Sequence, residues 1–275
     1  MSEFTTGTAA KVETPAGVDW PLRLFNKSVL KQRKLREIVD MLGPVDGQHC
    51  LDIGGDNGVI SYLLRQRGGA WKSADLDAHT VNAIRELVGP QVYQINDRQV
   101  PFDDNEFDAV VIVDFLEHIE RDDHFIAEMQ RILKPGGRLI INVPHIKNSL
   151  LRRLRQAIGQ TDEKHGHLRQ GYNQQTIEIL LGDRFTLEAS KTYSKFFSEF
   201  IDTLIVFSVS LLKGKKQEQS KKGLVVTGKD LKAYQSMFRL YALIYPLVWL
   251  VSKLDALLFF RSGYMWIGRA RVRKS

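Results

Sequence analysis

The chain of 275 residues is long enough for one large domain, and its 43% hydrophobic content supports a sizeable core and excludes a disordered protein. Its single cysteine, Cys50, excludes a disulfide framework and a cysteine-based zinc cluster. This low cysteine content fits a reducing compartment, and the sequence suggests no metal site. The net charge of +7 is uneven, because from Ile201 onward fourteen Lys or Arg residues stand against four Asp or Glu residues, which predicts an anionic partner, either phospholipid or nucleic acid.

The chain begins with a segment rich in Ser, Thr, Gly and Ala, and residues 1–20 are expected to form a flexible tail. It holds no basic region followed by an apolar stretch, so we expect no secretory signal and a cytoplasmic protein. Apolar residues near helical spacing then predict a helix over 21–42, with Asn26 or Ser28 as a cap and Gly43 and Pro44 as its stop.

Short apolar runs alternate with helical patterns from residue 49 onward. Strands are predicted at 49–53, 71–76, 92–95, 109–113, 138–143, 185–193 and 264–272, and helices at 58–67, 80–88, 122–133 and 176–181. Strands separated by helices of this length imply right-handed crossovers, so we expect an α/β fold with a Rossmann-like, doubly wound, mostly parallel seven-stranded sheet. Ligands of such sheets bind at the carboxyl ends of the strands.

The expected organisation is a core with one insertion. The core covers residues 21–195, an apolar and basic helical insertion covers 196–263, and residues 264–275 return to the sheet as its final strand. The run Lys134-Pro135-Gly136-Gly137 is interpreted as a turn that ends a helix and opens a strand.

A glycine-rich run from Leu51 to Gly58 joins the first strand to its helix. Gly54, Gly55 and Gly58 would let the backbone approach a ligand and turn into a helix whose amides face it. Such a turn equally fits a dinucleotide enzyme. Asp52 favours another ligand, because a carboxylate here would repel a pyrophosphate but suits cationic ammonium and sulfonium groups.

Polar residues after the next strands extend this predicted site. Asp75 is expected to accept the ribose hydroxyls of an adenosine, whereas Asp77 is more simply an N-cap of the following helix. Asn96 and Asp97 are candidates for binding an adenine amino group. The predicted cofactor-binding residues are Asp52, Gly54, Gly55, Gly58, Asp75, Leu76, Asn96, Asp97, Asp114 and Phe115.

Five motifs between about residues 50 and 145 form one pattern. They are Leu51 to Gly58, Asp75, Val100 to Asp108, Leu116-Glu117-His118-Ile119 and Leu133 to Leu139. Together they resemble the class I S-adenosylmethionine (SAM) dependent methyltransferases, specifically the broad small-molecule family called methyltransferase type 11. The resemblance implies SAM as the cofactor and methyl transfer as the activity. Asp56 stands where that family has its middle glycine, which leaves a non-catalytic SAM-binding scaffold as an alternative.

Methyl transfer from a sulfonium depends mainly on alignment, and a base is needed only when the acceptor must lose a proton. Candidates for a base are Glu117, His118 and His145, although capping and packing explain the first two about as well. An anionic acceptor would be bound by residues after the fifth strand, which have an equally good interpretation as solvated loop residues. These substrate-binding candidates are His165, His167, Arg169 and Tyr172.

Two apolar stretches, 196–212 and 240–260, are interrupted by charges and fit a membrane surface better than a membrane span. The basic run 213–232 lies between them, as in an anchor on anionic lipid. We therefore expect a peripheral membrane protein with a small or lipid-linked acceptor, such as a glycolipid, a polyprenyl-linked sugar or a quinone-like molecule. The alternatives are burial of both stretches against the core or in a homodimer, and an RNA methyltransferase, which is less favoured because aromatic stacking platforms are missing between the basic residues.

Overall fold

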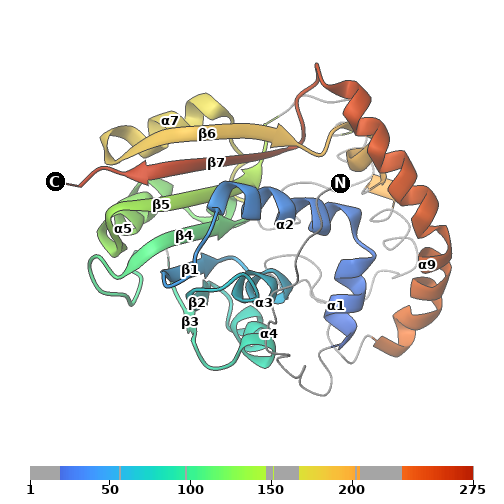
Figure 1. Cartoon of the computed structure of the whole chain (residues 1–275), viewed down its shortest axis with the longest axis horizontal. Helices are drawn as coiled ribbons and strands as arrows, with labels where there is room; N and C mark the ends of the chain where they lie inside the picture. Colours follow the sequence, from blue (N-terminus) through green and yellow to red (C-terminus); the bar gives the residue numbers. More distant parts are fainter. Residues whose placement is uncertain are drawn as a thin grey trace.

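The computed structural model describes residues 19–55, 57–96, 98–146, 151, 167–201, 203–204 and 231–274. One seven-stranded sheet has the order β3-β2-β1-β4-β5-β7-β6, and β7 runs antiparallel to both of its neighbours (Figure 1). The strands are β1 (His49–Ile53), β2 (Ala70–Asp75), β3 (Val92–Gln94), β4 (Phe107–Val113), β5 (Leu133–Pro144), β6 (Phe185–Tyr193) and β7 (Met265–Val272). The predicted α/β fold with a mostly parallel seven-stranded sheet is confirmed.

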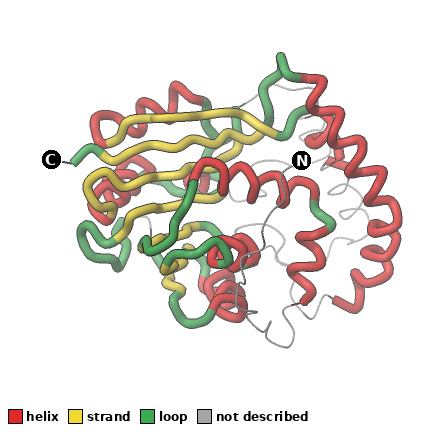
Figure 2. Tube along the Cα trace, viewed as in Figure 1, coloured by secondary structure: helices red, strands yellow, loops and turns green. Residues whose placement is uncertain are grey.

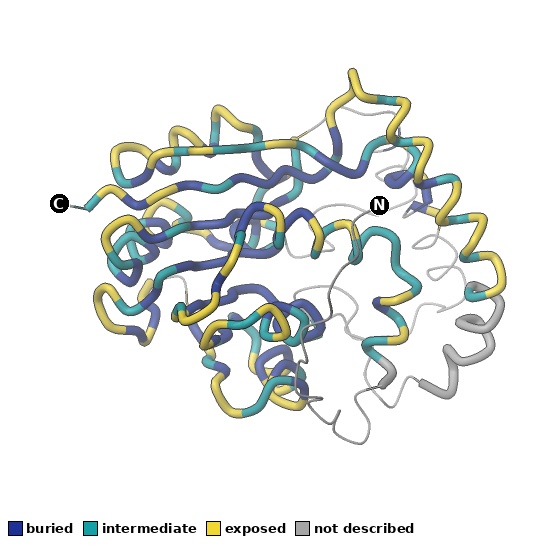
Figure 3. Tube along the Cα trace, in the orientation of Figure 1, coloured by how far each residue is buried: buried dark blue, intermediate teal, exposed yellow. Residues whose placement is uncertain are grey.

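Helices cover both faces of this sheet (Figure 2). They are α1 (Asp19–Asn26), α2 (Val29–Leu42), α3 (Val59–Arg65), α4 (Ala78–Val88), α5 (Asp122–Ile132), α7 (Gln174–Leu181) and α9 (Leu231–Lys253), with the short 3-10 helices η1 (Leu116–His118), η3 (Gly182–Arg184) and η4 (Leu254–Leu258). Side chains alternate across β4, so that Val110 and Ile112 enter the core shared with α5 and α7, while Val111 and Val113 enter the core shared with α2 and α3. The central strands are accordingly buried on both faces (Figure 3).

The single helix predicted over 21–42 is divided into two. Ser28 interrupts it with an extended backbone, and its Oγ accepts the Lys31 N–H at 3.3 Å, which makes it the N-cap of α2. The helix ends as expected at Gly43, whose N–H donates to the Val39 carbonyl. Of the predicted flexible tail, residues 1–18 lie outside the described residues, and α1 already begins at Asp19.

Strand β5 starts five residues earlier than the predicted strand at 138–143, directly after α5. The run from Lys134 to Gly137 is therefore part of an irregular strand, and the turn predicted there is wrong. The pairing of β4 with β5 shifts register between Phe107 and Ala109, which accommodates the run next to β4. Asp108 holds it in place, because its Oδ2 accepts a hydrogen bond from Lys134 Nζ at 2.8 Å.

Between β6 and β7 the chain leaves the sheet, as expected. Residues 196–201 are helical, and Asp255 of η4 caps this helix by accepting the N–H groups of Lys195 at 2.7 Å and Phe197 at 2.9 Å. Helix α9 reaches α2 through Tyr245, whose hydroxyl accepts a hydrogen bond from Gln32 at 3.1 Å. Most of the predicted basic run, 213–230, lies outside the described residues. Within the described part of the chain, we find no helix long and apolar enough to cross a membrane.

Candidate functional site

The glycine-rich turn after β1 is held by close packing. Gly54 has φ +87°, and a Cβ atom there would lie 2.1 Å from the Val113 carbonyl oxygen at the end of β4. Gly58 has φ +81°, and its Cβ would lie 2.9 Å from the Cα of Ile84 in α4. Both positions therefore require glycine for packing alone, in addition to any approach to a ligand. Asp56, the departure from the family pattern, lies outside the described residues.

The Asp52 carboxylate faces the protein interior. It is 1% exposed, it accepts hydrogen bonds from Ser61 Oγ and from Ser73 Oγ at 2.7 Å, and Arg65 Nη1 lies 3.3 Å away. Burial raises the pKa of Asp52, and the Arg65 charge opposes this shift. Gly55 packs on the same cluster, since a Cβ there would lie 2.4 Å from Ser61 Oγ. These contacts support a role for Asp52 in shaping the turn, and direct contact with a cationic ligand stays a prediction.

The second strand ends at Asp75, which is fully buried beside the glycine turn. The turn and this strand end are tied together, because the Gly54 N–H donates to the Ala74 carbonyl at 3.1 Å. Asp75 Oδ1 accepts the Asp77 N–H at 3.2 Å, and Asp77 in turn accepts the Thr80 N–H at 3.1 Å. The predicted N-cap role of Asp77 is confirmed.

Residues near the predicted adenine end are peripheral to this cluster. Leu76 is half-buried against the main core. Asn96 is exposed, and its Oδ1 accepts the N–H groups of Arg98 at 2.9 Å and Gln99 at 3.0 Å, which forms a turn of its own. Asp97 lies outside the described residues.

Asp114, at the carboxyl end of β4, joins a polar network that sequence analysis missed. It has a left-handed backbone with φ +45°, accepts a hydrogen bond from Asn142 Nδ2 at 2.9 Å and pairs with Lys34 of α2. Tyr193 at the end of β6 donates to Asn142, and burial together with the Asp114 charge raises the pKa of Tyr193 well above its usual value. The network connects α2, β4, β5 and β6 at one end of the sheet, and no local pattern marks it.

Phe115, a predicted cofactor-binding residue, lies in the core, and its contact with a cofactor stays a prediction. It is fully buried, and its ring packs on Phe125 with a centroid distance of 5.1 Å.

Some of the predicted base and substrate-binding residues after β4 and β5 lie close together. Glu117, His118 and His167 come together, with ligand atoms within 4.8 Å of one another. His145 makes a separate contact. Its Nδ1 lies 2.9 Å from the carbonyl oxygen of Gly263, just before β7. His165 lies outside the described residues.

Arg169 and Tyr172 both make hydrogen bonds within the protein, and their predicted role in substrate binding stays a prediction. Arg169 pairs with Asp122 and donates to the Ile119 carbonyl at 2.6 Å. Tyr172 is 3% exposed, and its hydroxyl lies 2.8 Å from Asp122 Oδ2 and 3.1 Å from the Leu116 carbonyl. Both side chains fasten their segment to η1 and α5.

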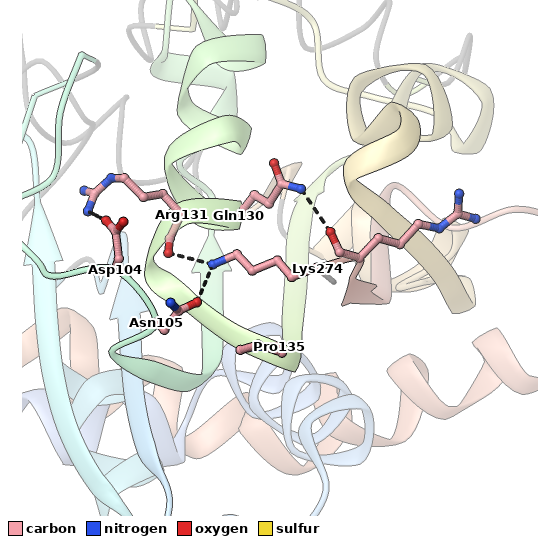
Figure 4. Close-up of a pocket in the computed structure, with 7 residues that line it drawn as sticks. Asp104, Asn105, Gln130, Arg131, Pro135 and Lys274 are labelled. Carbon is pink, nitrogen blue, oxygen red and sulfur yellow. Dashed lines mark hydrogen bonds and ion pairs between the residues drawn. The ribbon is translucent and has the colours of Figure 1, made fainter.

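A hollow of about 460 Å³ lies at the opposite, amino-terminal end of β4 and β5. Its polar groups bind one another, because Lys274 donates to Asn105 at 2.8 Å and to the Arg131 carbonyl at 2.7 Å, while Arg131 pairs with Asp104 (Figure 4). This end of a parallel sheet is not where ligands of doubly wound folds bind. We therefore assign the site to the carboxyl end.

Comparison with known proteins identifies the type of domain. A family model described as "Methyltransferase domain" matches residues 51–141. Similar sequences include the demethylmenaquinone methyltransferase of Tropheryma whipplei (28% identical, covering 38% of this chain and 46% of that protein) and a ubiquinone/menaquinone biosynthesis C-methyltransferase of Vibrio cholerae (33%, 38% and 45%). A fatty-acid O-methyltransferase of Mycolicibacterium smegmatis is 35% identical over 34% of this chain and 36% of its own length. The matched region thus spans less than half of each relative.

Solved structures share the fold at low sequence identity. The [4+2]-cyclase SpnF is 17% identical with a TM-score of 0.56, covering 89% of this chain and 82% of its own. A SAM-dependent methyltransferase of Thermotoga maritima is 16% identical with a TM-score of 0.55, covering 94% and 96%. The geranyl diphosphate C-methyltransferase of Streptomyces coelicolor, which was crystallised with S-adenosylhomocysteine, is 13% identical with a TM-score of 0.53, covering 89% and 78%.

These findings show that residues 51–141 carry a methyltransferase domain on a class I methyltransferase fold. The domain match and the expected family agree, and they indicate SAM as the cofactor.

Proposed function

We propose that this chain transfers a methyl group from SAM to a small or lipid-linked acceptor, such as a glycolipid, a polyprenyl-linked sugar or a quinone-like molecule, at an anionic membrane surface. The match to the methyltransferase domain model supports methyl transfer as the reaction. The names of the relatives support the acceptor class, because two act in quinone biosynthesis and one on fatty acids.

The donor would bind across the ends of β1 and β2. A buried carboxylate at Asp75, next to the Gly54 turn, suits two ribose hydroxyls, which donate to it as neutral groups. The network around Asp114 lies on the neighbouring strands β4 and β5, where an acceptor would meet the donor. In-line alignment of this kind can supply roughly 7 to 11 kcal/mol of the barrier lowering without a dedicated base.

An exposed apolar surface supports contact with lipid. Large apolar side chains are exposed between residues 242 and 260, in α9 and after it. Figure 3 colours much of this part of the trace as exposed. These side chains are Leu243, Ile244, Leu247, Trp249, Leu250, Leu254, Leu257, Phe259 and Phe260. The exposed cations Lys253, which lies 4.6 Å from the Trp249 ring centroid, and Arg261 border this surface and complement anionic headgroups. An apolar surface of this kind beside basic residues is typical of an interfacial anchor.

Donor binding tests the cofactor site. Two hydrogen bonds to a charged carboxylate contribute about 3 kcal/mol or more together, so Asp75→Asn should weaken binding of S-adenosylhomocysteine by about a hundredfold or more in calorimetry. Asp123→Asn, at an exposed position of α5, is the matched control and should bind like the wild type. Equal affinity of Asp75→Asn and wild type would refute the assigned site.

The acceptor class is tested with radiolabelled SAM and fractionated cell extract. Label is expected in the lipid fraction. Label in RNA would overturn the proposed acceptor in favour of an RNA methyltransferase, and donor binding without transfer to any fraction would indicate a non-catalytic scaffold.

Membrane contact is tested by flotation with phosphatidylglycerol vesicles. The wild type should float, and the double variant Leu243→Glu/Leu247→Glu, at positions 78% and 63% exposed, should remain at the bottom. Ile179→Glu on α7 is a matched control, because Ile179 is 73% exposed but belongs to another helix. Failure of the wild type to float, or equal loss in the Ile179 variant, contradicts the membrane proposal.

A further inference from the structure

A carboxylate and two imidazoles come together just after the carboxyl end of β4. Glu117 and His118 belong to η1, and His167 lies far along the chain, after β5. One ligand atom from each residue lies within 4.8 Å of the other two. Glu117 is 1% exposed, while both histidines are half-buried and therefore accessible from solvent. We propose that Glu117, His118 and His167 form a binding site for one divalent transition-metal ion.

The backbone around the three residues is fixed by hydrogen bonds between main-chain groups. The His118 N–H donates to the Phe115 carbonyl at 3.0 Å, which closes the turn of η1. The Leu168 N–H donates to the Glu117 carbonyl at 2.8 Å, so the residue after one histidine is tied directly to the carboxylate-bearing turn. Because the backbone of such a site is ordered before the ion binds, binding costs less conformational entropy.

Two side chains strengthen this connection. Arg169 pairs with Asp122 and donates to the Ile119 carbonyl, and Tyr172 reaches the Leu116 carbonyl with its hydroxyl at 3.1 Å. They bind on both sides of the Glu117 turn. Their contacts thus fit positioning of His167 better than contact with a substrate.

The donor set selects the kind of ion. Two imidazoles and one carboxylate suit Zn²⁺, Mn²⁺ or Fe²⁺, whereas Mg²⁺ and Ca²⁺ prefer oxygen ligands alone. Bonds of about 2.0 to 2.2 Å place ligand atoms roughly 3.3 to 4.4 Å apart around an ion, so a small side-chain adjustment from 4.8 Å completes the site. Three protein ligands leave coordination positions open for an oxygen of water or of a bound molecule.

The competing explanation is packing. The His118 and His167 rings meet edge to face with a centroid distance of 4.9 Å, a geometry that aromatic contact also favours. The two explanations predict different results. A metal site binds an ion and needs all three side chains for it, whereas packing alone predicts no ion binding.

The experiment uses the full chain after treatment with EDTA. Isothermal titration with Zn²⁺ and with Mn²⁺, together with the visible absorption of a Co²⁺ complex, should show one ion bound per chain at micromolar concentration. His167→Ala and Glu117→Gln should each weaken binding by at least about tenfold and abolish the Co²⁺ bands of the intact site. His124→Ala, at an exposed position of α5 outside the cluster, should bind like the wild type.

Circular dichroism of each variant separates loss of the site from loss of the fold. Should one variant unfold, the other and the His118→Ala variant test the same site. A wild type that binds no ion at micromolar concentration, or folded variants that bind as tightly as the wild type, would overturn the inference. The titration needs neither donor nor acceptor, so its failure leaves the proposed methyl transfer intact, and failure of methyl transfer leaves the metal site intact.

Discussion

Replacement of Gly54 by alanine tests the two reasons why this position needs glycine, its left-handed backbone and its close packing. The left-handed backbone at φ +87° costs an L-residue about 1 to 2 kcal/mol. The added Cβ would also lie 2.1 Å from the Val113 carbonyl oxygen, and the backbone shift that relieves this contact costs about 1 to 3 kcal/mol more. We expect Gly54→Ala to lower the free energy of unfolding by about 2 to 5 kcal/mol in urea titrations, and to weaken donor binding because the turn must move.

Gly136→Ala is the matched control for this experiment. Gly136 has φ +72° but no atom within 4 Å of an added Cβ, so only the conformational cost of about 1 to 2 kcal/mol applies. It lies near the start of β5, away from the assigned site, and donor affinity should be unchanged. Equal destabilisation of the two variants, or unchanged donor affinity of folded Gly54→Ala, would refute the packing argument.

Three further predictions concern buried polar groups. Tyr193→Phe removes the hydrogen bond to Asn142 and should cost about 1 to 3 kcal/mol in thermal unfolding; an unchanged melting temperature would contradict the network. Because burial raises the folded pKa of Asp52 above the unfolded value of about 3.9, its carboxyl stabilises most below that pH, and this contribution falls as pH rises through the folded pKa. The stability of wild type relative to Asp52→Asn should therefore fall with rising pH from about 4, and a flat difference would argue against the shift. Burial raises the pKa of Cys50 to about 12, so this sole cysteine should react with a disulfide reagent at mildly alkaline pH only after unfolding; rapid labelling of the folded protein would disprove its burial.

Local patterns predicted the elements of the fold well. Alternation over 185–193 and 264–272 located β6 and β7 to within a residue, and the cap at Asp77 follows from its place before a helix. Errors arose where tertiary contacts override such patterns. The Lys134 run has turn-forming residues, yet it lies inside β5, between Leu133 and Arg138, which both pair with β4.

The site was predictable only where residues are close in sequence. Asp52 and the glycines were identified from one run, but the partners Ser61 and Ser73 come from other elements; only the spacing of Ser61 and Arg65, one helical turn apart, offered a hint. Phe115 was itself a candidate, but it is fully buried and packs on Phe125, a partner in a later helix.

Contacts across long separations explain the remaining differences. Arg169 and Tyr172 have the chemistry of ligand-binding residues, but Asp122 engages both, and this partner lies in an earlier helix. No spacing rule links a histidine after β5 to a turn after β4, which is why the cluster containing His167 emerges only in three dimensions.

The placement of β7 between β5 and β6 bears on how the protein is made. Among the described strands, β6 pairs with β7 alone. Once β6 has been synthesised, its hydrogen-bonding edge therefore has no strand partner until the segment from 194 to 264 has been translated. During this interval an incomplete sheet exposes a strand edge, the kind of surface on which nascent chains aggregate. Slow synthesis between the two strands would therefore lengthen the time for which this strand edge is exposed.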